Sequence, residues 1–332
     1  MMKMMLEVDI KSPAKKINYS DRIFLIGSCF TEHIGRRLQE LKFPVTQNPN
    51  GILFDPVSVC DSLQSYIKLK NYKQGDLFYL NELWQSWNHH SIFSGMDAEN
   101  VLLNINLSQR EAHEKLKQAT WLIITLGSSF SYQLVQHDQP VANCHRAPGQ
   151  WFNKNLLSVE NIVSILANII EDLKAFNPEL KIIFTISPVR HIRDGVVENN
   201  RSKARLIEAV HQIVEKSSNA YYFPAYELVL DVLRDYRFYD VDLVHPNYAA
   251  TEFVFEKFEE SFIDPAAEAV MEEIKKISSG YRHKPFQPDT LSHLSFLKSN
   301  FEKVKTLQEK LPHLDFSKEL TYFSKRNPQT GQ

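Results

Sequence analysis

The chain has 332 residues, of which 43% are hydrophobic, and this is enough apolar material for a large folded core. Its 38 basic and 40 acidic residues leave a net charge of -2, which excludes the strongly positive surface typical of nucleic-acid-binding proteins. Residues 1–13 lack the apolar stretch of a secretory signal, and no run elsewhere is long enough to span a bilayer. The three cysteines are scattered, which argues against a disulfide framework. We therefore expect a cytoplasmic protein with no nucleic-acid partner and no membrane span.

Short apolar runs alternate along the chain with segments of helical periodicity. The first run, residues 22–26, ends at Gly27 and is followed by Ile34, Leu38 and Leu41 at helical spacing. Further strands are predicted at residues 121–125, 181–186 and 220–223, and helices after Pro56, at 162–176 and at 199–216. Such alternation predicts a three-layer α/β/α fold with a parallel, flavodoxin-like sheet covered by helices on both faces.

Two segments depart from this alternation. Residues 76–93 are rich in aromatic side chains, and we predict an inserted hairpin there, over the edge of the sheet, that could serve as a lid or pocket wall. After residue 262 the strand pattern stops and charged, helical sequence follows, with a break at Pro285 and Pro288. The sequence therefore predicts a main α/β domain at residues 1–262 and a helical C-terminal appendage at residues 263–332.

Polar residues gather where the predicted strands end. In an open α/β sheet a ligand binds beyond the carboxyl ends of the strands, so these residues are the candidates for a site. A further polar group precedes the helix that we expect to begin at Pro246. The candidate segments are Gly27-Ser28-Cys29, Asn50-Gly51, Gly127-Ser128-Ser129, residues 187–191 and residues 242–247.

Ser28, Asp242 and His245 have the residue types of a nucleophile, its general base and the carboxylate that orients the base. A serine hydroxyl is a weak nucleophile until an imidazole accepts its proton, and that imidazole needs an acceptor at its other nitrogen. Asp242 and His245 are close enough in sequence for both side chains to project from one loop. Taken alone, Ser28 also fits a helix cap, and the Asp-x-x-His pattern fits an ordinary loop.

Taken together and in this order, the segments resemble the GSCFA family, a branch of the SGNH/GDSL hydrolases. The resemblance rests on Gly-Ser-Cys-Phe at 27–30 and Asp-Leu-Val-His-Pro at 242–246, with Leu-Gly at 126–127, Asn-Cys-His at 143–145 and Ser-Pro-Val-Arg-His at 187–191. It spans about residues 23–258 and leaves out the C-terminal appendage. It implies an SGNH-like hydrolase in which Ser28 is the nucleophile, Asp242 and His245 are its partners, and no cofactor is needed.

The resemblance also implies an oxyanion hole built from the backbone N–H groups of Ser28 and Gly51. SGNH hydrolases usually add an asparagine from a Gly-x-Asn-Asp block, but this chain has Gly-Ser-Ser-Phe at 127–130. Losing one such donor typically lowers a rate by about 10²–10³-fold, so we expect a substitute. We predict that Asn143 or His145 fills the place, with Ser129 as a further candidate; the alternative is that residues 143–145 form a surface turn.

Other polar residues near the strand ends are predicted to contact substrate: Ser129, His145, Arg190, His191 and His90. Arg190 could hold a substrate carboxylate or phosphate through its planar fork, or form an ion pair with Asp240 or Asp242. Cys29 is a rival nucleophile, although a small buried core residue is the simpler interpretation. The spacing of the histidines and cysteines fits no zinc motif, so we expect no catalytic metal.

The predicted function is hydrolysis of an O-acyl ester of a small molecule or glycan through an acyl-enzyme on Ser28. One alternative is an O-acyltransferase that passes the same acyl group to a sugar hydroxyl. Another is a non-catalytic binding protein built on a hydrolase fold. The acyl group, the alcohol and the oligomeric state stay open at this level.

Overall fold

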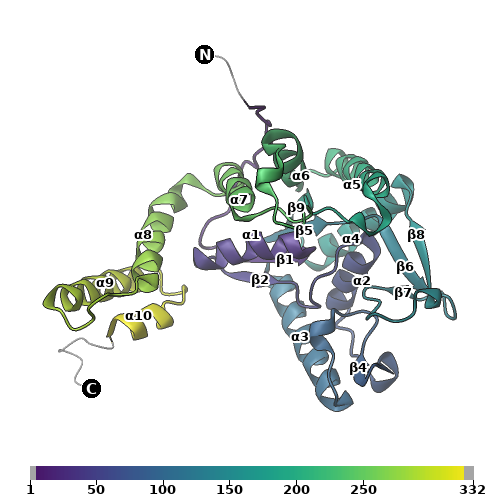
Figure 1. The fold of residues 1–332 in the computed structure, drawn as a ribbon, viewed down its shortest axis with the longest axis horizontal. Coiled ribbons are helices and arrows are strands. Elements are labelled where there is room, and N and C mark those ends of the chain that lie inside the picture. The colour runs from purple at the N-terminus through teal and green to yellow at the C-terminus, as the bar shows by residue number, and fades with distance from the viewer. Residues whose placement is uncertain (1–4, 325–332) are drawn as a thin grey trace.

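The computed structural model describes residues 5–324 and has a parallel five-stranded sheet at its centre (Figure 1). The strand order is β2-β1-β5-β9-β10, which is the flavodoxin-like order that the sequence predicts. The strands are β1 (Ile23–Gly27), β2 (Val45–Gln47), β5 (Trp121–Leu126), β9 (Lys181–Ile186) and β10 (Ala220–Phe223). All carboxyl ends therefore lie at one edge of the sheet, where a site is expected.

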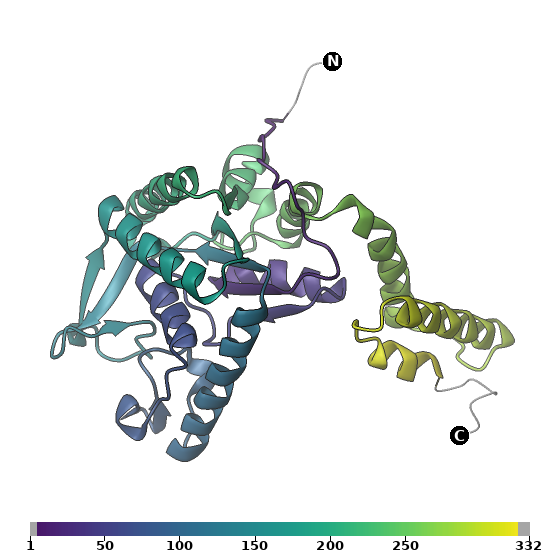
Figure 2. The same ribbon diagram turned by 180° about the vertical axis from the view of Figure 1, so that it is seen from behind.

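The two faces of the sheet enter two separate hydrophobic cores, because successive side chains of a strand point to opposite sides. On β1, Ile23 and Leu25 belong to one core and Phe24 and Ile26 to the other. The first core is covered by α1 (Cys29–Glu40) and α7 (Tyr248–Phe262), and the second by α2 (Pro56–Ile67), α3 (Ala98–Gln118), α4 (Val159–Phe176) and α5 (Val196–Lys216). The three-layer α/β/α prediction is confirmed (Figures 1 and 2).

Two insertions of antiparallel strands interrupt the alternation. The first is the hairpin of β3 (Phe78–Leu80) and β4 (Leu83–Gln85), which packs on α3 through residues such as Trp84 and Val101 rather than over the edge of the sheet. Its turn residues Asn81 and Glu82 have φ of 51° and 64°, as the tight turns favoured in two-residue hairpins require. The second insertion, which the sequence analysis missed, joins β6 (Phe130–Leu134), β7 (Pro140–Val141) and β8 (Phe152–Leu156).

Irregular helical turns connect β10 to α7. They are α6 (Ala225–Glu227), a π-helical turn (Leu228–Leu233) and a 3-10 turn (Tyr236–Phe238). The π-helical turn ends at Arg234 in the left-handed region, with φ of 48°. This connection delivers the chain to residues 239–247, which hold the predicted Asp-x-x-His pair.

The C-terminal helices extend from the end of α7 away from the sheet (Figure 1). They are α8 (Pro265–Arg282), α9 (Leu291–Lys310) and α10 (Ser317–Ser324). Their buried side chains, including Met271, Val304 and Phe323, continue the core on the α1 face of the sheet. The appendage is therefore joined to the rest of the chain through packing as well as through the backbone.

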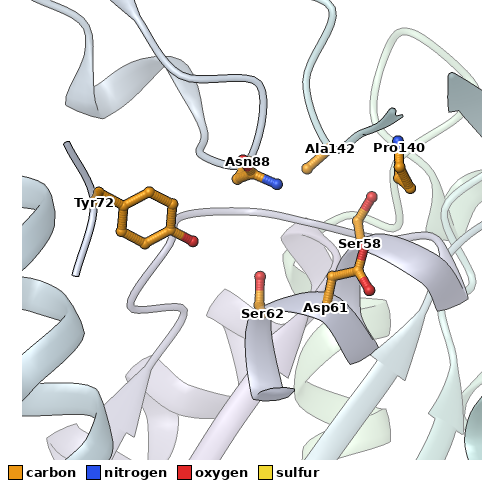
Figure 3. Close-up of a pocket in the computed structure, with 7 residues that line it drawn as sticks. All are labelled: Ser58, Asp61, Ser62, Tyr72, Asn88, Pro140 and Ala142. Carbon is orange, nitrogen blue, oxygen red and sulfur yellow. The ribbon is translucent and has the colours of Figure 1, made fainter. Parts of the chain in front are cut away.

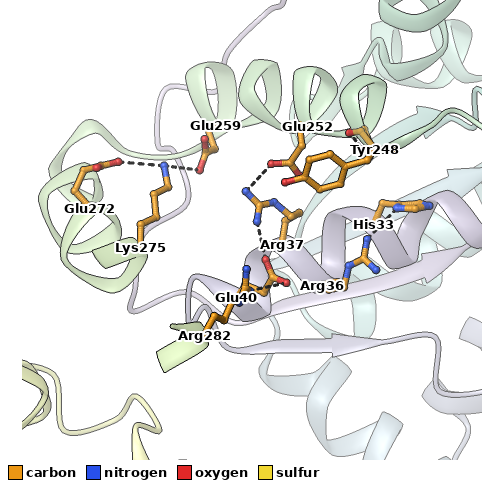
Figure 4. A network of polar contacts seen from close by, with 11 residues as sticks. His33, Arg36, Arg37, Glu40, Tyr248, Glu252, Glu259, Glu272, Lys275 and Arg282 are labelled. Carbon is orange, nitrogen blue, oxygen red and sulfur yellow. Dashed lines mark hydrogen bonds and ion pairs between the residues drawn. The ribbon is translucent and has the colours of Figure 1, made fainter. Parts of the chain in front are cut away.

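A polar network crosses the junction between α1, α7 and α8 (Figure 4). Arg37 forms ion pairs with Glu40 at 2.6 Å and with Glu252 of α7 at 2.8 Å, and Glu40 also pairs with Arg282 of α8 at 3.1 Å. Pairs this exposed contribute only about 0–1 kcal/mol each, so the apolar core does more to hold the junction. Within residues 5–324, no helix is long and apolar enough to cross a membrane.

Candidate active site

Ser28 lies where β1 passes directly into α1. It is 1% exposed, and its N–H donates to the Thr125 carbonyl of β5 at 3.0 Å. Its Oγ accepts the Phe30 N–H at 3.3 Å and so caps α1. The hydroxyl therefore lies at a helix N-terminus, where unpaired N–H groups and the helix dipole favour negative charge.

Backbone contacts fix the position of Ser28 from both sides. Gly27 has φ of 143°, and a Cβ added there would lie 2.2 Å from the Thr125 carbonyl oxygen, so only glycine lets the strands approach this closely. Asn48, which follows β2, accepts the Gly27 N–H through Oδ1 at 2.9 Å. Neighbouring strands on each side of β1 thus hold the residue before the candidate nucleophile.

Asp242 and His245 form a hydrogen-bonded pair on one loop, as predicted from their spacing. His245 Nδ1 donates to Asp242 Oδ2 at 2.6 Å, and the Val244 and His245 N–H groups donate to Oδ1 at 2.9 and 3.0 Å. The His245 backbone N–H, then its side chain, holds the pKa of Asp242 at about 2. Both side chains are 46% exposed, so Nε2 of His245 is accessible to a reacting partner.

Arg190 braces this loop. Its backbone N–H donates to the Val244 carbonyl at 3.2 Å, and its guanidinium donates to the Leu243 carbonyl at 3.3 Å while lying 4.4 Å from the Tyr239 ring centroid. In the described part of the chain Arg190 forms no ion pair with Asp240 or Asp242, so that prediction is wrong. The guanidinium contacts the Leu243 carbonyl and the rings of Tyr236 and Tyr239 instead.

The helix after the loop begins later than expected. Asn247 is the N-cap, since its Oδ1 accepts the Ala250 N–H at 3.2 Å, and α7 starts at Tyr248. Pro246 instead pairs with Tyr239 in an isolated β-bridge. His245 therefore belongs to an extended loop and is not a helix cap.

His191 follows β9 and shares a small space with Ser28. A Cβ added to Gly127 would lie 3.0 Å from His191 Nε2 and 3.4 Å from Ser28 Cβ, so both residues lie against this glycine. Burial, followed by the charges of Lys203 and His245, lowers the pKa of His191 to about 3. The charge of His245 also lowers the pKa of His33 on α1, after burial and Arg36. His245 therefore lies within electrostatic range of both α1 and the end of β9.

The predicted backbone donors of the oxyanion hole are both engaged. The Gly51 N–H donates to the Asn48 carbonyl at 2.7 Å, and the Ser28 N–H donates to Thr125. These bonds belong to the turn after β2 and to the pairing of β1 with β5. The prediction that these two N–H groups stand free for an oxyanion is therefore corrected.

Ser129 and His145 have structural partners rather than an open site. Ser129 is 0% exposed, and its N–H donates to Ser202 Oγ at 2.7 Å, so the predicted substrate contact is wrong and Ser129 ties α5 to the strand end. His145 is 7% exposed, donates from Nε2 to the Ser86 carbonyl at 2.8 Å and lies beside the Trp87 ring. It thus packs within the first insertion.

Asn143 and His90 lie around the same insertion. Asn143 Oδ1 accepts the His145 N–H at 2.9 Å, and neither side chain is hydrogen-bonded to Ser28 within the described residues. The expectation that this segment supplies the missing donor therefore gains no support. The His90 N–H donates to the Asn50 carbonyl at 2.9 Å, which places His90 beside the loop after β2.

Cys29 contacts the apolar core on the α1 face of the sheet, as the simpler interpretation of this residue expects. Burial, and then the charge of Glu32, raise the pKa of its thiol. A raised pKa disfavours the reactive thiolate, which weakens Cys29 as a rival nucleophile. Among the residues that the structure describes, no group of three or more His, Cys, Asp or Glu side chains could hold a metal ion.

A separate pocket lies between α2 and the two insertions (Figure 3). Ser58, Asp61, Tyr72 and Asn88 are among its lining residues. It includes neither Ser28 nor the Asp242–His245 pair.

The structure adds two residues that the sequence analysis overlooked. Asn48 Nδ2 is a buried donor without a partner in the described part of the chain, and the oxygen of the same amide accepts the Gly27 N–H. Lys203 of α5 is 1% exposed and donates to the Ser187 carbonyl at 2.6 Å. Asn48 follows a short, half-buried strand that gives little signal in the sequence, and a lysine on a helix gives no sign of burial.

Comparisons with known proteins agree with the sequence motifs. Residues 22–258 match the GSCFA family, and residues 274–329 match the GSCFA domain protein, C-terminal domain. No curated protein matches the sequence.

Several solved structures overlap the fold only loosely. A carbohydrate esterase family 3 from Talaromyces cellulolyticus has 9% identity and a TM-score of 0.35, with 77% of this chain and 99% of that chain covered. An acetyl esterase mutant with acetate ion has 12% identity and a TM-score of 0.33, with the coverage again 77% and 99%. An acetyl xylan esterase (Est2A) from the rumen bacterium Butyrivibrio proteoclasticus has 12% identity and a TM-score of 0.29, with coverage of 73% and 64%. Likenesses this distant assign no substrate, whereas the family match spans most of the α/β part: the chain belongs to the GSCFA family.

Proposed function

We propose that the protein is a serine hydrolase that cleaves O-acyl esters of a small molecule or glycan. Ser28 Oγ attacks the ester carbonyl while His245 Nε2 accepts the hydroxyl proton, and the same proton then passes to the leaving alcohol. A water molecule attacks the acyl-enzyme with His245 again as base, which releases the acid and restores Ser28. Asp242 holds His245 in the tautomer whose Nε2 can accept a proton.

The observation that carries this proposal is the 2.6 Å bond from His245 Nδ1 to Asp242 on a loop tied to the same sheet edge as Ser28. Arg190, which follows β9, connects this loop to the sheet by hydrogen bonds to the carbonyls of Leu243 and Val244. We expect Ser28 Oγ and His245 Nε2 to approach to about 2.6–3.2 Å in the substrate complex, with a looser contact at rest.

Covalent labelling of the full chain with a fluorophosphonate tests the proposal, because only an activated serine reacts readily. We expect one adduct, located at Ser28 by peptide mass spectrometry, and none in Ser28→Ala. A folded wild-type protein that takes up no label, or takes it up at another serine, would contradict the assignment and favour a non-catalytic binding protein.

An O-acyltransferase acting through the same acyl-enzyme is the second candidate. It is favoured by the openness of the loop that holds Asp242 and His245. Val241, Leu243 and Tyr248 are all exposed on or beside this loop, so a bulky acceptor has access to His245. Incubation with an acyl ester in the presence and absence of a polyol separates the two reactions. Free acid as the product under both conditions supports the hydrolase, and acylated polyol supports the transferase.

A further inference from the structure

The segment that follows β9 is hydrogen-bonded almost throughout. The Ser187 N–H donates to the Leu126 carbonyl at 2.8 Å, and the Ser187 carbonyl accepts from Lys203 Nζ. The His191 N–H donates to Asn199 Oδ1 at 2.8 Å. The position of the His191 ring is therefore fixed from α5 and from the sheet.

His191 Nε2 is the exception in this segment, because it is buried and has no hydrogen-bond partner among residues 5–324. A buried polar atom without a partner costs about 1–3 kcal/mol, so a substrate oxygen that accepted a hydrogen bond from this atom would recover that cost. This atom and the Ser28 Cβ both lie against Gly127, on the side where a Cβ of that residue would project. His191 Nε2 therefore lies near Ser28, whose hydroxyl would attack the substrate carbonyl.

The protonation state of His191 suits a hydrogen-bond donor to a developing negative charge. Because burial and the charge of Lys203 hold the pKa of His191 at about 3, the ring is neutral at physiological pH. A neutral imidazole carries one N–H, and its weak basicity leaves proton removal from Ser28 to His245, which has a carboxylate partner.

We propose that His191 donates its Nε2–H to the substrate carbonyl oxygen as it becomes an oxyanion, in place of the asparagine that this chain lacks. This inference rests on the proposed function. It assigns the donor to the end of β9 and not to residues 143–145.

Kinetics of His191→Ala and His191→Gln test the role, with p-nitrophenyl acetate as substrate and fluorophosphonate as label. Removing the donor should lower kcat by about 10²-fold with little change in KM, since the bond strengthens only in the transition state. His191→Gln places an amide N–H near the same point and should recover part of the loss. His137→Ala, at an exposed position between β6 and β7, is the matched control and should keep wild-type rates.

Each other outcome points to a different conclusion. Wild-type turnover with unchanged rates in both His191 variants would overturn the inference and leave the proposed function intact; Asn48→Ala would then be examined for the missing donor. Equal loss in His191→Ala and His191→Gln, with a changed pH profile, would make His191 a base instead of a donor. Absence of turnover and labelling in the wild type would remove the proposed function and this inference together.

Discussion

The two halves of the proposed triad are held by different means. Ser28 is 1% exposed and is fixed by the backbone of β5 and, through Gly27, by the side chain of Asn48 after β2. Asp242 and His245 are 46% exposed and are held by hydrogen bonds within one loop and by Arg190. The nucleophile therefore depends on the whole sheet for its position, whereas the base depends on a few local contacts that can be changed without disturbing the fold.

Substitution of the nucleophile should have the largest effect. We expect Ser28→Ala to lower esterase activity by about 10³-fold or more, because the acyl-enzyme cannot form. Hydrolysis of p-nitrophenyl acetate, with thermal unfolding to confirm the fold, measures the loss. The cap bond to Phe30 is also lost, at a cost of about 1 kcal/mol in stability.

The neighbouring thiol is the matched control for this variant. Cys29→Ala should keep most of the activity, since Cys29 contacts the apolar core. If Cys29→Ala were folded and inactive while Ser28→Ala stayed active, the nucleophile would be the thiol.

Substitution of Asp242, in the exposed half of the triad, should lower activity less than substitution of Ser28. We expect Asp242→Asn to lower kcat by about 10²–10³-fold, less than the roughly 10⁴-fold seen for buried triad carboxylates, because water can partly replace an exposed partner. Since the pKa of Asp242 is about 2, its carboxylate stays ionised from pH 4 upward and should add no step to the wild-type pH profile there. Kinetics between pH 4 and 9 test both points. An Asp242→Asn variant with wild-type kcat would exclude Asp242 as the orienting residue.

The sequence predicted the buried strands well and the exposed elements poorly. The strands β1, β5 and β9 are apolar on both faces and read as unbroken hydrophobic runs. The strand β2 is short and half-buried, and most of α3 faces solvent, so neither gave a comparable signal. Burial on two faces leaves a stronger mark on a sequence than burial on one.

The candidate site divides in the same way. Ser28 and the Asp242–His245 pair could be found because their chemistry depends on residue type and on neighbours in sequence. The sequence could not reveal that His191 Nε2 lacks a partner among the described residues or that Ser129 is buried. Both residues are bonded to α5, which reaches the strand ends only in the folded protein.

Lys203 lies in the buried half of the site, and its protonation should change the free energy of unfolding with pH. Burial lowers the pKa of Lys203 to about 7, against about 10.4 in an unfolded chain. Between these values the unfolded state binds more protons, so this group makes the free energy of unfolding rise with pH from about 7 to 10, by a few kcal/mol. Below about pH 7 the cost of the buried ammonium is fully present.

Urea unfolding of wild type and Lys203→Met at pH 6, 8 and 10 measures this contribution. We expect the variant to lack this rise, so that its stability relative to wild type is most favourable at pH 6. Taking the difference between the two proteins cancels the other titrating groups. Parallel stability profiles would show that Lys203 keeps an ordinary pKa.

The smallest effect is expected at Arg190, where the two halves of the site meet. Arg190→Ala removes the bond to the Leu243 carbonyl and the contact with Tyr239, but keeps the backbone bond to Val244. We therefore expect kcat/KM for p-nitrophenyl acetate and the fluorophosphonate labelling rate to fall together, each by about 10-fold, with about 1 kcal/mol or less lost in stability.

The choice of substrate and variants separates bracing from substrate binding at Arg190. Arg190→Lys should recover only part of the rate, because an ammonium lacks the planar fork that spans a carbonyl and a ring. Arg237→Ala, which removes an exposed side chain paired with Asp235 on the same connection, should behave as wild type. If Arg190 instead held a substrate anion, its loss would raise KM for anionic esters and leave a neutral ester and the labelling rate unaffected. A parallel loss of labelling and of neutral-ester turnover therefore identifies a positioning residue, because both reactions need His245 in place and neither needs an anion site.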